Sequence, residues 1–96
     1  MTELTLFSSR QHALKPLVEA ALQNEIRMLA AGIRRTQQRL QDFETRYGLA
    51  TAEFVRGYEN DELAETLEYA EWIGEFRLLS RLQEKIDTLR EIRFAS

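Results

Sequence analysis

The stretch that decides the fold is residues 22–47, which read LQNEIRMLAAGIRRTQQRLQDFETRY. Its apolar residues are spaced alternately four and three positions apart, with Thr36 filling the one gap in the series: Leu22, Ile26, Leu29, Ile33, Leu40, Phe43 and Tyr47. This spacing is the heptad seam of a coiled-coil helix rather than the broad apolar stripe of a globular one. The pattern therefore predicts a long helix that packs along a narrow line.

Pro16 and Gly48 mark the predicted ends of this helix. A proline suits the first helical turn, where its missing N–H would have no partner, and a glycine directly after Tyr47 suits a left-handed C-cap. At about 1.5 Å per residue, a helix over 16–47 would measure roughly 48 Å, which is too long to be buried in one small domain. Residues 1–15 show no helical pattern. Leu4 and Leu6 alternate with Glu3 and Thr5, so a short β-segment and a flexible N-terminal arm are both possible, and we expect the arm.

A second helical pattern follows a connection that we place at residues 48–60. Thr51 is a candidate N-cap for a short helical turn that carries Phe54. The second long helix is expected from 61 to 93, because acidic residues at positions 61 and 62 suit the positive end of a helix dipole. Two long helices with a short connection form an antiparallel hairpin. The predicted fold is all-α, a coiled-coil hairpin over 16–96.

The second helix carries apolar side chains around more than half of its circumference, including Trp72, Phe76 and Leu78. A chain of this size has little core of its own, and these side chains exposed together would form a patch typical of an interaction site. They either fill the core of the hairpin or are covered by a second chain. We expect a second chain, and another copy would complete a dimeric four-helix bundle.

Composition narrows the classes of function. A net charge of −3 and a pI near 5.2 argue against a general affinity of this chain for nucleic acid or anionic membranes. The chain has no cysteine, which excludes disulfides and thiolate metal sites and makes the cytoplasm the expected compartment. No segment resembles a signal peptide or a membrane span, and no cofactor is expected.

The most unusual local feature is an acidic run. Between residues 59 and 75 there are seven acids and no base, namely Glu59, Asp61, Glu62, Glu65, Glu68, Glu71 and Glu75. The run could be a solvated face balanced across the hairpin, whose expected register pairs Glu75 with Arg35, Glu71 with Arg39 and Glu65 with Arg46. It could also dock a basic protein partner, steered by charge. A divalent-metal site is the third possibility, but the first helix offers only Asp42 and Glu44 to complete it.

Three short motifs resemble a known family. The segments Phe43-Glu44-Thr45-Arg46-Tyr47-Gly48-Leu49, Thr51-Ala52-Glu53-Phe54 and Glu71-Trp72 are similar to the antitoxin halves of TumE/TumA-type toxin–antitoxin pairs, over roughly residues 40–80. In that group a helix ends in a Tyr-Gly-Met-like turn, where this chain has Leu49 in place of Met. The resemblance implies a protein that binds and neutralises a toxin encoded beside it.

We therefore expect a non-catalytic protein-interaction module that binds a protein partner and self-associates, and not an enzyme. The expected partner-binding residues are Glu65, Glu68, Glu71, Trp72, Glu75 and Phe76, and the expected structural turn consists of Tyr47, Gly48 and Phe54. No catalytic, cofactor-binding or metal-binding residue is predicted. The alternatives are a homo-oligomeric structural or adaptor coiled coil and a metal-dependent helical nucleotide pyrophosphatase.

Overall fold

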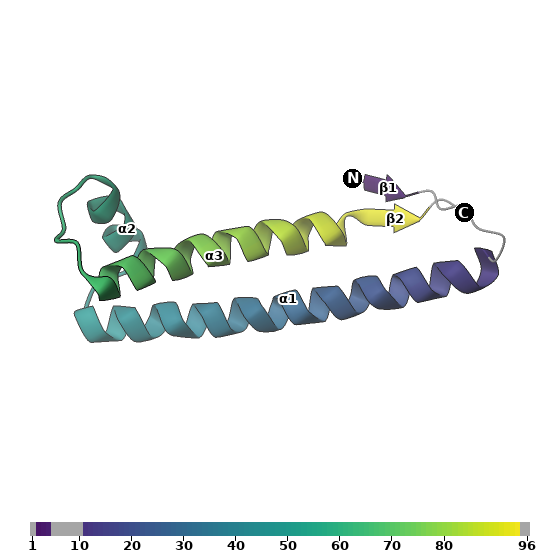
Figure 1. The fold of residues 1–96 in the computed structure, drawn as a ribbon, viewed down its shortest axis with the longest axis horizontal. Helices are drawn as coiled ribbons and strands as arrows, with labels where there is room; N and C mark the ends of the chain where they lie inside the picture. Colours follow the sequence, from purple (N-terminus) through teal and green to yellow (C-terminus); the bar gives the residue numbers. More distant parts are fainter. Residues whose placement is uncertain (1, 5–10, 95–96) are drawn as a thin grey trace.

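The chain folds as an elongated hairpin of two long helices with a short helix packed at its closed end (Figure 1). The computed structural model describes residues 2–4 and 11–94. The elements in chain order are β1 (Thr2–Leu4), α1 (Gln11–Tyr47), α2 (Thr51–Glu59), α3 (Leu67–Arg90) and β2 (Ile92–Phe94). The molecule measures 59 × 22 × 18 Å. The predicted pair of long helices, packed against each other, is confirmed.

The heptad seam of α1 faces α3, as the spacing predicts. Leu29, Thr36 and Leu40 are buried along it, and Thr36 is among the most completely buried side chains of the described residues. Gly32 also lies in the contact, because a Cβ at this position would sit 3.5 Å from the side chain of Leu82. One narrow line of α1 therefore carries the contact with α3.

The helix begins earlier than predicted, at Gln11 rather than Pro16. Pro16 has no N–H to donate to the carbonyl four residues earlier, so the first turns lack one bond, but the helix continues through it. Of the predicted arm over 1–15, residues 11–15 are thus helical and residues 2–4 form β1. The remaining positions of the arm lie outside the described residues.

Gly48 ends α1 as predicted. Its φ is +62°, a left-handed conformation that glycine adopts without a steric penalty. Its N–H donates to the carbonyl of Glu44 at 2.8 Å, and the N–H of Leu49 donates to the same carbonyl at 3.4 Å. These bonds satisfy the free end of the helix and turn the chain toward α2.

The connection contains a full helix rather than one turn. Thr51 is the first residue of α2 and not its N-cap, which is Ala50. Ala50 has no side chain that can cap, and the carboxylate of Glu44 supplies the acceptor instead, 2.8 Å from the N–H of Thr51. A side chain from the end of α1 thus fixes where α2 begins.

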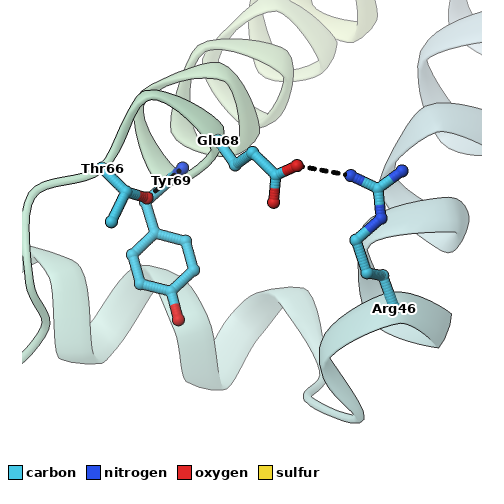
Figure 2. Close-up of polar contacts among 4 residues, drawn as sticks. All are labelled: Arg46, Thr66, Glu68 and Tyr69. Carbon is cyan, nitrogen blue, oxygen red and sulfur yellow. Dashed lines mark hydrogen bonds and ion pairs between the residues drawn. The ribbon is translucent and has the colours of Figure 1, made fainter.

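The second long helix begins at Leu67 and ends at Arg90, so the predicted bounds of 61 and 93 are both wrong. After α2 the chain needs residues 60–66 to return to α1, and Asp61 adopts a positive φ of 55° on the way. Thr66 then caps α3, because its hydroxyl accepts from the N–H of Tyr69 at 3.1 Å (Figure 2). The acids at 61 and 62 belong to this return segment.

Two short strands join the ends of the chain beside the open end of the hairpin (Figure 1). β1 and β2 pair in parallel, with Thr2 opposite Ile92, Glu3 opposite Arg93 and Leu4 opposite Phe94. The alternation of apolar and polar residues at 3–6 left a β-segment open, and the structure places a strand at 2–4. The C-terminal strand was not predicted, because the helical pattern appeared to run on to residue 93.

Candidate functional site

Trp72 lies at the centre of the closed end of the hairpin, inside the chain. Its ring is stacked on Phe54 of α2, with centroids 3.9 Å apart, and on Phe43 of α1, with centroids 5.3 Å apart. Its indole N–H donates to the hydroxyl of Thr51 at 3.1 Å. The exposed fractions of Trp72 and Phe54 are both 0%. The expectation that a second chain covers Trp72 is therefore wrong, because α2 of the same chain covers it.

The other predicted aromatic residues surround this core. Phe76 is half-buried and packs against the same cluster, so it too contributes to the core of the hairpin. Tyr47 packs edge-on against Tyr69, with centroids 5.3 Å apart, and keeps 36% of its surface exposed. Tyr47, Gly48 and Phe54 thus occupy the closed end predicted for them. Among the aromatic rings of this turn, Tyr47 remains the most exposed to solvent.

Two of the seven acids form ion pairs across the hairpin, in a register different from the expected one. Arg39 binds Glu75 at 2.7 Å, and Arg46 binds Glu68 at 2.8 Å (Figure 2). The expected partners of these arginines were Glu71 and Glu65, so the pairs are displaced along the second helix by about one turn. The expected pair of Arg35 with Glu75 is also wrong. The cause is the later start of α3, which moves each of its residues relative to α1.

The other five acids of the run are exposed: Glu59, Asp61, Glu62, Glu65 and Glu71. Within the part of the chain that the structure describes, none of them forms an ion pair. Four of them lie between the end of α2 and the start of α3, and Glu71 lies one turn inside α3. We call these five residues the acidic tip. Among the described residues, the acidic run thus consists of two carboxylates in ion pairs and five without one.

One exposed apolar side chain lies within the acidic tip. Leu67, the first residue of α3, keeps 76% of its surface exposed. It follows Glu65 closely in the chain and precedes Glu71 by one helical turn. The apolar spacing of the second helix does not predict this exposure. Only its position at a helix start, outside the contact with α1, distinguishes it from the core leucines.

A shallow groove runs beside the ion pairs, with a volume of about 350 Å³. The groove is lined by two arginines, three acids and one aromatic ring, namely Arg39, Asp42, Phe43, Arg46, Glu71 and Glu75. The arginines here lie close to the carboxylates that they balance. Nowhere in the described ranges do three or more His, Cys, Asp or Glu side chains form a group that could hold a metal ion.

No helix in the described part of the chain combines the length and apolar character that crossing a membrane requires. Comparison with protein-family models, with curated proteins and with solved structures found no match to this chain.

Proposed function

We propose that this chain is a non-catalytic interaction module that docks a basic surface of another protein onto its acidic tip, as the antitoxin of a toxin–antitoxin pair. The observation that carries the proposal is the exposure of five carboxylates with no basic neighbour in an ion pair among the described residues. An excess of negative charge on one part of a protein surface attracts an opposite charge. A basic partner would supply that charge.

The exposed leucine supports the same proposal. A typical protein interface has an apolar centre surrounded by a polar rim, and the rim steers the encounter while the centre excludes water. In the acidic tip, Leu67 corresponds to the apolar centre and the carboxylates correspond to the polar rim. Since α2 and α3 are fixed to each other by the buried stack at Trp72, the surface is held rigid before a partner arrives.

The antitoxin assignment rests on the resemblance of the turn motifs, whose residues have clear physical roles here. Gly48 makes the left-handed turn, Phe54 covers the indole, and Glu71 lies on the acidic tip. In this proposal the chain acts in the cytoplasm and self-associates into a dimeric four-helix bundle. The apolar group that supports self-association is not Trp72 or Phe76 but Leu78 of α3, which is half-buried and lies outside the core cluster.

The experiment is co-expression and pull-down with the product of the neighbouring gene. The wild type is compared with a variant that removes three charges of the acidic tip, Glu62→Gln/Glu65→Gln/Glu71→Gln. A matched control removes three exposed charges elsewhere, Glu19→Gln/Glu84→Gln/Glu91→Gln. We expect capture by the wild type and the control and reduced capture by the tip variant. Equal capture by all three proteins would move the partner to another surface.

A second variant tests the apolar centre. Leu67→Ala should leave the melting temperature unchanged, because the side chain is mostly exposed, and should weaken partner binding. Leu17→Ala is its control, since Leu17 is also mostly exposed, with 68% of its surface accessible, but lies near the other end of the hairpin. Failure to capture any neighbouring product, while the chain remains folded and dimeric, would favour the homo-oligomeric adaptor.

A further inference from the structure

Charge divides the hairpin into two opposite halves. Residues 40–75 carry ten acids and two arginines, a net charge of −8, and we call them the acidic section. Residues 26–39 and 76–90 together carry eight bases and two acids, a net charge of +6, and we call them the basic section. The overall charge of −3 conceals this separation.

The division falls at one level of the molecule. Arg39 is the last residue of its basic segment and Glu75 is the last residue of the acidic section, and the two are joined by an ion pair of 2.7 Å. The net charge of both long helices therefore changes from basic to acidic at the same level along the hairpin. One half of the elongated molecule is acidic and the adjoining part is basic, so two copies in opposite directions are complementary.

A stripe on α3 crosses this division. Glu71, Leu78 and Lys85 are spaced by seven residues, and such positions share one face of a helix with a drift of only about 20° per heptad. Glu71 and Lys85 are exposed, and Leu78 is half-buried. Ile73, which belongs to the core cluster that includes α2, lies about 200° around the helix from Glu71. The stripe therefore faces away from α2, and Glu71 at its start lines the groove beside Arg39 and Arg46 of α1.

We propose that this stripe docks on the same stripe of a second copy, with the two α3 helices antiparallel and centred on Leu78. Each Glu71 then lies opposite Lys85 of the other copy, twice by symmetry, and the two Leu78 side chains meet between them. The boundary between the acidic and basic sections, after Glu75, is less than one helical turn from Leu78. Antiparallel pairing centred on Leu78 therefore places the acidic section of each copy on the basic section of the other. The inference rests on the self-association in the proposed function and adds its geometry.

The apolar residues at the two ends of the stripe agree with this direction. Leu67 lies four residues before Glu71 and is 76% exposed, and Leu89 lies four residues after Lys85 and is half-buried. The antiparallel pairing that places Glu71 opposite Lys85 also brings Leu67 of one copy level with Leu89 of the other. A pairing of the two helices in the same direction would instead place Glu71 on Glu71 and the acidic sections together, which like charges oppose.

The test is a charge exchange within the full chain, measured by sedimentation equilibrium at low salt. The wild type should have twice the chain mass of 11.3 kDa, and added salt should weaken the dimer. Glu71→Lys and Lys85→Glu should each weaken it by about tenfold or more, because each brings like charges together at two places. The double variant Glu71→Lys/Lys85→Glu should restore it, since the opposite pairs are rebuilt with the signs exchanged.

Glu84→Lys is the matched control, an exposed charge reversal about 100° around the helix from Lys85. It should remain a dimer. Circular dichroism melting shows whether each variant folds. A monomeric wild type, or a double variant as weak as the single ones, overturns the pairing. A wild type that stays monomeric and binds a duplex DNA of random sequence would assign the basic section to nucleic acid instead.

Glu71 and Leu67 belong both to the acidic tip and to this pairing, so a partner and a second copy compete for them, and Lys85 distinguishes the two contacts. Lys85→Glu leaves the acidic tip unchanged, so loss of the dimer with retained capture of the neighbouring gene product would support both proposals. A dimer that responds to the charge exchange but captures no partner would support the pairing and contradict the docking function.

Discussion

At the residue scale, the fold depends on how one polar atom inside an aromatic stack is satisfied. Trp72 buries its whole ring between Phe43 and Phe54, and its N–H would be left without a partner if Thr51 did not accept it at 3.1 Å. Thr51 reaches that position because the carboxylate of Glu44 holds its backbone N–H. The three elements of the closed end are therefore connected through one chain of contacts from Glu44 to Trp72.

Thr51→Val should lower the free energy of unfolding by about 1 to 3 kcal/mol, because it leaves the buried indole N–H without an acceptor while keeping the shape of the side chain. Thr45→Val is the control, since Thr45 is exposed on α1. Chemical denaturation measures both, and the fluorescence of the single tryptophan reports on the site directly. Equal stability of the two variants would mean that the indole does not depend on this hydroxyl.

Two glycines should respond to alanine with opposite signs. Gly48→Ala should lower the free energy of unfolding by about 1 to 2 kcal/mol, since its φ of +62° is left-handed. Gly74→Ala should raise it by about 0.5 to 1 kcal/mol, because Gly74 is inside a helix and a Cβ there would meet nothing within 4 Å. Thermal melts of the two variants test the turn and the helix separately, and shifts in the same direction would contradict this assignment.

At the element scale, the lengths of the helices set which charges meet. The segment over 60–66 is a return from α2 and not the first turns of the second helix, so α3 is displaced by about one turn relative to the predicted register. This displacement pairs Glu68 and Glu75 with arginines and leaves Glu65 and Glu71 exposed. Structural and free carboxylates are therefore separated by the position of one helix start.

Glu68→Gln/Glu75→Gln should lower stability only slightly, by about 0.2 to 1 kcal/mol for each pair, because Arg39 and Arg46 are both largely exposed. The same variant should leave partner capture unchanged, since neither residue belongs to the acidic tip. Melting curves and pull-down of this double variant, beside the acidic-tip variant, distinguish the two groups of acids. A large loss of capture without a change in melting would place Glu68 or Glu75 in the docking surface.

Local signals predicted the two long helices and the turn between them, and long-range packing decided their bounds and their register. The seam of α1 and the turn at Gly48 follow from spacing and backbone conformation, which are properties of neighbouring residues. The cap at Thr66 and the burial of Trp72 depend on where α2 packs, and α2 is positioned by Glu44, seven residues from the N–H that it accepts. The acidic run is therefore visible in the sequence, whereas its ion pairs depend on the packing of α2 and α3 and were predicted wrongly.

At the scale of the whole molecule, the elongated shape leaves a large share of the chain on the surface. The hairpin is 59 Å long and 22 × 18 Å in cross-section, with its described core concentrated in the half that contains α2. The acidic tip lies at this end, next to the core. The same molecule holds a basic section beside it, so its acidic section is complementary both to a basic partner and to the basic section of a second copy.

The central claim is that the acidic tip docks a basic protein partner. Its most direct test is the association rate of the chain with the product of the neighbouring gene, at low and at high salt. The account predicts that Glu62→Gln/Glu65→Gln/Glu71→Gln slows association at low salt, that the difference fades at high salt, and that the melting temperature is unchanged. An unchanged association rate at low salt, with a lowered melting temperature, would show that these carboxylates are structural and would contradict the claim.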